Sequence, residues 1–583
     1  MLFEVSEAPV SSSSRTAPAS APSHADGSAA PWFEGRDLPW LALACALVAV
    51  VYASSWSAGF TLDDRHSLLT NPVVQGEVPW WEAFVREYRG KLFSEGWASS
   101  YRPVTVVSFT FVHRIADGPR LQHLCNLFVY ALVIVQVARF SRRFFEASAW
   151  RWLAALAFAV MPAHVENVAS IVGRSDLLSV CFGLVALELA LPAKGEPPAG
   201  RVRTGLSCLA FALALLSKES IAPLPAAALW LAWREAELPA KKLFEPRTTW
   251  AALRPALPLA LTGVAYILIR QQWMPVGLPE GFVHADNQLV PADFVGRFVG
   301  RFTVLGHYVE LFAWPAALCA DHTYADVWIA PGAEGLWRSP AAPYTWLGIA
   351  ATAGCGYALL RALRRPGSDG RAASAWVLFA IAMILLAHGL TLLSVIVAER
   401  LMLWPSVFLA IALAASLPKA TPRARQLALA GTVLVIVGWG LRSRARAPDW
   451  NDPVSLHESS ARACPRAVHG RLNAALAHRN AGHPAEAVWH YALAAAGRSA
   501  YPGPWESLAF EAERLYPLEA RLARLPEVLG IPPERLWPGM HAYLVSEGAM
   551  AEANLVAALA SGGRGAGETS TRDSAPAPGV GSP

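Results

Sequence analysis

Long apolar runs separated by short charged loops make up most of the chain between residues 38 and 441. A helix needs about 20 consecutive apolar residues to cross the hydrocarbon core of a bilayer. The pattern therefore predicts an all-α polytopic membrane helical bundle with about 11 spans, at 38–58, 121–138, 150–166, 176–192, 204–217, 220–233, 252–270, 343–361, 374–396, 401–417 and 425–441.

Two further apolar stretches are interrupted by polar side chains. Residues 103–118 contain His113, Arg114 and Asp117, and residues 294–318 are interrupted in the same way. Charged side chains are costly at the centre of a bilayer. We therefore expect 103–118 to lie on the outer surface and 294–318 to form an outer amphipathic or re-entrant segment.

The composition agrees with a membrane protein. Hydrophobic residues make up 54% of the chain and charged residues 16%, and the mean hydropathy is +0.33. Soluble domains carry about 25% charged residues. The net charge of +5 is modest and gives no reason to expect nucleic acid as a partner.

Lysine and arginine concentrate in five short loops, at 139–144, 194–203, 234–254, 361–371 and 419–425. Such loops face the cytoplasm in most membrane proteins. One alternating topology places all five there together with the N-terminus, although the basic run Arg442–Arg446 then lies outside. The Ala/Leu/Arg-rich composition favours a bacterial inner membrane, with the C-terminal part in the periplasm.

Composition changes divide the chain into four parts. Residues 1–36 are rich in Ser, Ala and Pro and predict a disordered cytoplasmic tail, as do residues 563–583 for the other end. Residues 37–442 form the transmembrane domain. Residues 443–562 are polar helix formers and predict an exterior domain similar to tetratricopeptide repeats, with an unrelated small helical bundle as the alternative.

The repeat prediction depends on two stretches of this exterior domain. Residues 470–497 place Gly482 in a turn, followed by Ala487, Tyr491 and Ala494 on one helical face. That small–aromatic–small packing is typical of the second helix of a tetratricopeptide repeat. A degenerate second copy lies near 539–560.

The seven cysteines are scattered, and at least five lie in apolar runs. No C-x-x-C pair is present. They are interpreted as small core residues rather than a disulfide framework, and we expect neither a metal nor a cofactor.

Five polar clusters fall on the exterior side of this topology, and Asp63 and Asp64 form the first, directly after the first span. A carboxylate in a partly apolar site can act as general base on a hydroxyl. Asp63 is preferred because Asp64 adjoins Arg65 and has a ready partner there. The alternative is a solvated loop.

The second and third clusters add cations. Arg102, in the run SYRP, can bind a phosphate oxygen in bidentate fashion, or can simply extend to the headgroup region. Residues 161–178 hold polar side chains within an apolar stretch, namely His164, Glu166, Asn167, Arg174 and Asp176. His164 and Glu166 are metal-ligand types, but residues at i and i+2 diverge on a helix.

The last two clusters each pair a cation with a carboxylate. Lys218 and Glu219 lie between two apolar runs, where a charged turn is as good an explanation as a substrate contact. Glu399 and Arg400 can pair to offset the cost of burial, and Arg400 is also placed to meet an anionic headgroup. Together the five clusters suit a lipid-linked phosphosugar.

Seven short motifs in register resemble the transmembrane-and-tetratricopeptide-containing protein O-mannosyltransferases, a family of the GT-C glycosyltransferases. The resemblance covers about residues 38–500 and is carried by GFTLDD, SYRP, PRLQHLCN, FAVMPAHVENVASIVGRSDLL, LLSKES, AERLMLWPS and DWNDPVSL. It implies a GT-C fold and inverting transfer of a sugar, mannose above all, from a polyprenyl-phosphate donor on the outer membrane face.

The resemblance also implies roles for single residues. Asp63 or Asp64 would be the general base for a hydroxyl of a protein or glycan acceptor. Arg102, Arg174 and Arg400 would hold the donor phosphate, with His164, Glu166, Asp176, Lys218, Glu219 and Glu399 as further site candidates. The alternatives are a transporter or flippase of a lipid-linked or anionic solute, and a non-catalytic membrane-anchored scaffold.

Overall fold

The computed structural model describes residues 35–93, 100–192, 199–235, 245–273, 287–290, 292–320, 341–364, 370–417, 421–465 and 467–483, with isolated positions between 322 and 337 and between 486 and 561. Every regular element in these ranges is a helix, which confirms the all-α class. The α-helices are α1 (Leu38–Val51), α2 (Pro72–Gln75), α3 (Pro103–Ile115), α4 (Pro119–Phe140), α5 (Ser148–Ala159), α6 (Val165–Ala169), α7 (Arg174–Ala190), α8 (Arg201–Ser217), α9 (Leu224–Glu235), α10 (Pro246–Trp273), α11 (Phe294–Ala313), α12 (Ala342–Arg364), α13 (Arg371–Met383), α14 (Leu403–Ser416), α15 (Pro422–Arg446), α16 (Pro453–Ala463) and α17 (Val468–Asn480).

Five helical stretches are long and apolar enough to cross a membrane, and the protein is an integral membrane protein. They are Pro119–Arg143, Thr249–Gln272, Ala342–Arg364, Glu399–Ser416 and Pro422–Trp450. A sixth candidate is the pair Ser148–Ala159 and Pro162–Ala169, which is bent by 56°. Each of the predicted spans contains a helix, but several are shorter than a bilayer requires, so the count of eleven stays a prediction.

One predicted span is wrong over half its length. The apolar run 374–396 suggested a continuous helix, but α13 ends at Met383. Residues from Ile384 onward run in turns, and His388 adopts a positive φ of 53°. The physical reason is local, because Gly389 and the β-branched residues of the following run disfavour a helix. Extended backbone then leads into the turn before α14.

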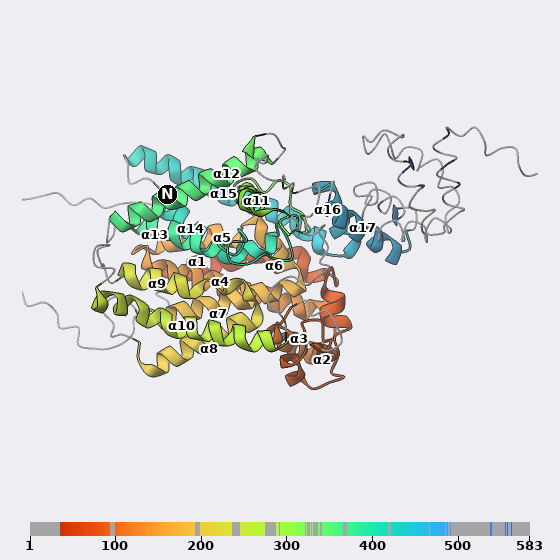
Figure 1. Ribbon diagram of the computed structural model, residues 1–583, viewed down its shortest axis with the longest axis horizontal. Coiled ribbons are helices and arrows are strands. Elements are labelled where there is room, and N and C mark those ends of the chain that lie inside the picture. The colour runs from red at the N-terminus through yellow and green to blue at the C-terminus, as the bar shows by residue number, and fades with distance from the viewer. Residues whose placement is uncertain are drawn as a thin grey trace, which may run out of the picture.

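The two surface segments expected outside the spans are both helical. The helix α3 lies beside α2 at one end of the bundle in Figure 1. The helix α11 is a continuous helix of 20 residues that packs along α12, and it is not among the candidate spans.

The bundle has two chemically different ends. Most of its helices run side by side, with α2, α3 and α6 at one end and α16 and α17 projecting beyond that same end (Figure 1). At the other end, three of the five basic loops contact one another, at 139–144, 234–254 and 361–371. Arg143 pairs with Glu235 and donates to the carbonyl of Leu191, and Arg234 donates to the carbonyl of Ala362 at 2.9 Å. These three loops therefore meet at one end of the bundle, and the side of the membrane on which that end lies stays a prediction.

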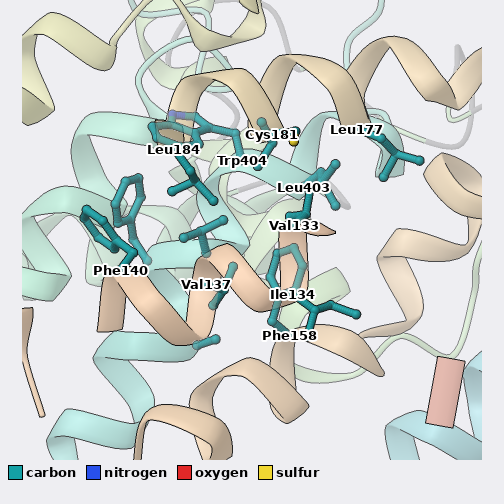
Figure 2. Close-up of a cluster of buried hydrophobic side chains, with 14 of the residues drawn as sticks. Val133, Ile134, Val137, Phe140, Phe158, Leu177, Cys181, Leu184, Leu403 and Trp404 are labelled. Carbon is teal, nitrogen blue, oxygen red and sulfur yellow. The ribbon is translucent and has the colours of Figure 1, made fainter. Parts of the chain in front are cut away.

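The centre of the bundle is packed by side chains from α4, α5, α7 and α14, as Figure 2 shows. The helix α4 supplies Val133, Ile134, Val137 and Phe140, and Trp404 approaches them from α14 with an exposure of 2%. Lipid tails are as apolar as these side chains, so close packing rather than escape from water holds such helices together. This core fixes the ends of the helices that carry the polar clusters.

The helices α11 and α12 cross where two glycines face each other. A Cβ on Gly306 would overlap the backbone of Tyr344, and a Cβ on Gly348 would overlap the backbone of Phe302. Small residues let the backbones of membrane helices approach closely. The crossing therefore tolerates no side chain at either position.

The helices α16 and α17 pack against each other. Gly482 lies in the turn after α17, with a φ of 78°. The predicted face with Tyr491 and Ala494, the second copy near 539–560 and the two tails, apart from Gly35 and Arg36, lie outside the described residues. The tetratricopeptide assignment stays a prediction.

Replacing Gly306 with Ala is expected to destabilise the protein by about 1–3 kcal/mol, because the added methyl forces α11 and α12 apart. Thermal unfolding of the purified protein in detergent measures the effect. Gly354→Ala is the matched control, since Gly354 lies on α12 with open space around it. Equal behaviour of the two variants would contradict the close crossing.

Candidate functional site

The two aspartates after α1 have opposite environments. Asp64 is fully buried, and its carboxylate accepts hydrogen bonds from the backbone N–H of Thr61 at 2.8 Å and of Val172 at 3.2 Å. Asp63 has an exposed side-chain fraction of 47% and pairs with Arg89 at 3.2 Å. The two carboxylates therefore point into different surroundings.

A strained turn produces this division. Leu62 precedes the pair with a φ of 49°, in the left-handed region that residues with a side chain rarely adopt. The turn closes with a hydrogen bond from the N–H of Asp64 to the carbonyl of Thr61 at 3.0 Å. The expectation that Arg65 is the partner of Asp64 is wrong, because Asp64 is satisfied by backbone groups and Arg65 is exposed.

Burial raises the pKa of Asp64 to about 7. The two backbone hydrogen bonds and the charge of Arg174 lower this pKa, and the neighbouring charge of Asp63 raises it, but desolvation dominates. Asp64 thus links the first loop to the turn before α7, and its charge state changes near neutral pH.

Arg102 lies at the start of α3 with its guanidinium over the ring of Tyr88, 5.0 Å from the ring centroid. Its nearest carboxylate oxygen belongs to Glu219, 4.0 Å from Nε. Among the described residues Nε has no hydrogen-bond partner, although it is buried. The Nε–H group of Arg102 is therefore available to donate a hydrogen bond to a ligand.

Lys218 and Asp176 form a buried ion pair of 2.6 Å between the end of α8 and the start of α7. The hydroxyl of Ser179 donates to the carbonyl of Lys218 at 2.9 Å. The hydroxyl of Thr105 donates to the carbonyl of Ser217 at 3.1 Å. These bonds bring α3, α7 and α8 together at one point.

Arg400 joins the segment before α14 to the segment before α7. Its guanidinium pairs with Glu166 at 2.7 Å, and its backbone N–H donates to the other oxygen of the same carboxylate at 2.9 Å. The side-chain amide of Asn167 donates to the carbonyl of Arg400 at 2.8 Å. The Arg400 side chain still exposes 31% of its surface.

The cations share one electrostatic environment. Burial lowers the pKa of Arg102, but Glu219, Tyr88 and Asp176 together raise it, so its pKa lies above the ordinary value. The charge of Arg400 lowers this pKa as well. The pKa of Lys218 is lowered by burial and by both guanidiniums.

The charges of Asp63 and Asp176 also act on Arg400. The five sequence clusters thus contribute to one polar region at the end of the bundle that carries α2, α3 and α6 (Figure 1).

Three predicted site residues are buried and make hydrogen bonds within the protein. Arg174 is 1% exposed, and its guanidinium donates to Asn126 and to the carbonyl of Gln122. His164 is fully buried between the hydroxyls of Tyr130 and Ser406. These contacts describe positioning and core residues rather than groups open to a ligand.

The third is Glu399, which is 1% exposed. Its carboxylate accepts from the backbone N–H of Cys319 and lies 3.3 Å from Nε2 of His322. Its partners thus differ from those of the neighbouring Arg400, which pairs with Glu166.

Sequence reasoning missed Arg89, Tyr88 and Asn126. Arg89 and Tyr88 lie in a long polar loop with no motif to mark them, and tertiary packing alone brings them to Asp63 and Arg102. Asn126 lies in the quoted run PRLQHLCN and donates to the carbonyl of Ser170 at 2.7 Å. Its signal was a polar residue within an apolar helix.

Known proteins similar to this chain are protein O-mannosyl-transferases. The chain is 35% identical to Protein O-mannosyl-transferase Tmtc2 of Drosophila melanogaster over 182 residues, which cover 27% of this chain and 19% of the fly protein. It is 26% identical to Protein O-mannosyl-transferase TMTC4 of Homo sapiens over 501 residues, 78% of this chain and 66% of the human protein. It is 34% identical to TMTC3 of Mus musculus over 20% of that protein. The matches thus span about a fifth of the Tmtc2 and TMTC3 relatives. No protein-family model matches the chain.

Two solved structures of archaeal oligosaccharyltransferase from Archaeoglobus fulgidus are similar at a low level. One is tethered with an acceptor peptide, with a TM-score of 0.38 and 15% identity over 72% of this chain and 56% of the other. The second is AglB in complex with an inhibitory peptide and a dolichol-phosphate, with a TM-score of 0.37 over 71% of this chain and 56% of the other.

The variant Asp64→Asn is expected to become more stable relative to the wild type as the pH rises. A folded pKa above the ordinary aspartate value of about 3.9 means that Asp64 contributes stability at low pH, which is lost as the pH rises through about 7. A neutral amide at position 64 escapes that loss. Thermal unfolding in detergent from pH 4 to pH 8 measures the difference, and parallel curves for the two proteins would contradict it.

Proposed function

Because the chain is a homologue of the TMTC protein O-mannosyl-transferases, we propose that it is a membrane glycosyltransferase. It transfers a sugar, mannose by family analogy, from a polyprenyl-phosphate donor to a hydroxyl of a protein acceptor. The observation that carries the proposal is that Asp63 pairs with Arg89 while Arg102 lies over the ring of the adjacent Tyr88. The charge of Asp63 also acts on Arg400. An accessible carboxylate near partly exposed cations suits transfer from an anionic donor.

Asp63 is the proposed general base. A base must reach the proton that it accepts, and Asp63 is half exposed whereas both oxygens of Asp64 are used by backbone N–H groups. The acceptor oxygen attacks the anomeric carbon, its proton passes to Asp63, and the bond from that carbon to the phosphate oxygen breaks. A single displacement of this kind inverts the anomeric centre.

Arg102 and Arg400 are the proposed ligands of the donor phosphate. Negative charge grows on the leaving phosphate, and preorganised cations stabilise it most in a site with little water. Arg102 has a spare donor at Nε, and Arg400 is held in direction by Glu166 while part of its side chain is exposed. Lys218 is not proposed as a phosphate ligand, because its charge is balanced by the buried ion pair with Asp176.

Arg174 and Asp64 are proposed to position these groups. Arg174 fixes the segment before α7 through Asn126, and Asp64 fixes the first loop to that same segment through Val172. The base and the phosphate ligands thus share one support. The exterior helices α16 and α17 stand at this end of the bundle and are proposed to present the polypeptide acceptor.

Replacing Asp63 with Asn is expected to lower kcat by about 10²- to 10⁴-fold, the usual contribution of a general base. The unfolding temperature and the KM for the donor should stay unchanged, because the Asp63 side chain is half exposed and pairs with Arg89 at the surface. Transfer from a polyprenyl-phospho-mannose to a peptide is the assay. The control is Glu77→Gln, an exposed carboxylate of the same loop. Full activity in Asp63→Asn would exclude Asp63 as the base.

Replacing Arg102 or Arg400 with Gln is expected to weaken binding of the donor by about 10- to 100-fold, because a hydrogen bond to a charged group contributes about 1.5–3 kcal/mol. Binding of a polyprenyl phosphate to the purified protein measures it without turnover. Arg114→Gln, an exposed arginine of α3, is the control. Unchanged donor binding in both variants, with transport of the lipid across vesicles retained, would favour a flippase instead.

A further inference from the structure

A group of three metal-ligand side chains lies where α16 meets the segment after α11. Cys319 and His322 follow α11, and Cys464 ends α16. The Sγ atoms of both cysteines and a ring nitrogen of His322 all lie within 4.8 Å of one another. Nδ1 of His322 is 3.6 Å from Sγ of Cys464, although the two residues are 142 positions apart.

The carboxylate of Glu399 orients the ring of His322. Nε2 of His322 lies 3.3 Å from the carboxylate of Glu399, which also accepts from the backbone N–H of Cys319. A proton on Nε2 donated to the carboxylate leaves the lone pair of Nδ1 directed at the thiol. Histidines that bind metals are typically held by a carboxylate in this way.

The surroundings of the group are closed and contain little other packing. Cys319 and Cys464 are each 1% exposed, and His322 is 7% exposed. The apolar cluster at this junction consists of the two cysteines and Ala467, with Ala463 packed against them. Residues this small bury little apolar surface, so they contribute little to holding α16 on the bundle.

We propose that Cys319, His322 and Cys464 bind a Zn²⁺ ion that fastens α16 to the bundle. Zinc binds thiolate sulfur at about 2.3 Å and imidazole nitrogen at about 2.0 Å, which makes a tetrahedral edge from sulfur to nitrogen about 3.5 Å long. The separation of 3.6 Å between Cys464 and His322 matches that edge. Binding releases the two thiol protons, and water completes the tetrahedron.

The charges balance when the ion is bound. Two thiolates neutralise the zinc, and the carboxylate of Glu399 lies against the backbone N–H of Cys319 and Nε2 of His322. The ion also has a consequence for the neighbouring residue. Glu399 directly precedes Arg400, so the zinc and its carboxylate would steady the turn that directs Arg400 toward Glu166.

A second group of possible ligands, Glu458, His478 and His490, is better explained without a metal. Nε2 of each histidine lies within 2.9 Å of the same oxygen of Glu458. Nη1 of Arg471 lies 3.4 Å from Nδ1 of His490, which makes that nitrogen an acceptor and puts the ring proton on Nε2, toward the carboxylate. This group is a satisfied hydrogen-bond cluster and provides an internal control.

The test is the zinc content of the full-length protein, purified in detergent from cells grown with zinc and measured by mass spectrometry of the metal. We expect about one Zn²⁺ per chain and at least a tenfold loss in Cys464→Ser and in Cys319→Ser. Glu399→Gln should weaken zinc binding by about 10- to 100-fold, as is typical for the partner of a metal-binding histidine. Cys355→Ser and His490→Gln are the controls and should keep the zinc.

Cobalt substitution tests the wild-type protein without relying on a variant that fails to fold. Co²⁺ bound here should show thiolate-to-cobalt charge-transfer absorption, and zinc should protect Cys319 and Cys464 from alkylation until a chelator is added. A disulfide between these two cysteines in the purified protein would overturn the proposal. So would zinc that persists in Cys464→Ser, or two thiols that react equally fast with and without added zinc.

Discussion

The pairing of charges is the constraint on which the proposed functional end of this molecule depends, and the ion pair between buried Glu166 and partly exposed Arg400 is its centre. It joins two segments that are 234 positions apart, with one oxygen of the carboxylate on the guanidinium and the other on the backbone N–H. A buried charge without a partner costs several kcal/mol, about 3–5 kcal/mol when one partner is removed. Each charge therefore holds the other in place. Asp176 and Lys218 repeat the arrangement between α7 and α8. These pairs fix the ends of helices that the apolar core alone would leave free to slide.

The adjacent residues Asp63 and Asp64 have different environments because the chain turns directly before them. The left-handed conformation at Leu62 directs Asp64 into the protein and leaves Asp63 at the surface beside Arg89. Asp64 receives two backbone N–H groups and loses its solvent, whereas Asp63 keeps both solvent and a cation. A dense set of contacts thus supports one accessible carboxylate. The arginines differ in the same way. The guanidinium of Arg174 is buried and hydrogen-bonded within the protein, whereas that of Arg400 is oriented by Glu166 and stays partly exposed. Rigid support beneath an exposed group is what a catalytic site requires.

Much of this could be predicted from the pattern of the chain. Each apolar segment contains a helix, because a backbone in lipid must satisfy its own hydrogen bonds. Three of the basic loops meet at one end of the bundle and the polar clusters lie at the other, whereas the topology across the membrane stays a prediction. Two predictions were wrong, one on the length of a helix and one on the partner of a side chain. The helix that ends at Met383 was overestimated because an apolar run does not distinguish helix from extended backbone. The partner of Asp64 was misassigned because its carboxylate accepts from two backbone N–H groups, of nearby Thr61 and of Val172, 108 positions away.

The sequence by itself determined the helical class, the membrane character, the polar clusters and the relationship to the O-mannosyl-transferases, because each depends on residue types within a short window. Only the tertiary structure decided which charges pair, which aspartate is exposed, and that Cys319 and His322 meet Cys464. Cys319 and His322 stand three residues apart, which is a local signal, but Cys464 comes from the end of α16, 142 positions from His322. Side-chain contacts across 100 or more positions depend on how helices pack, and the pattern of apolar and polar residues along the chain carries no record of that packing.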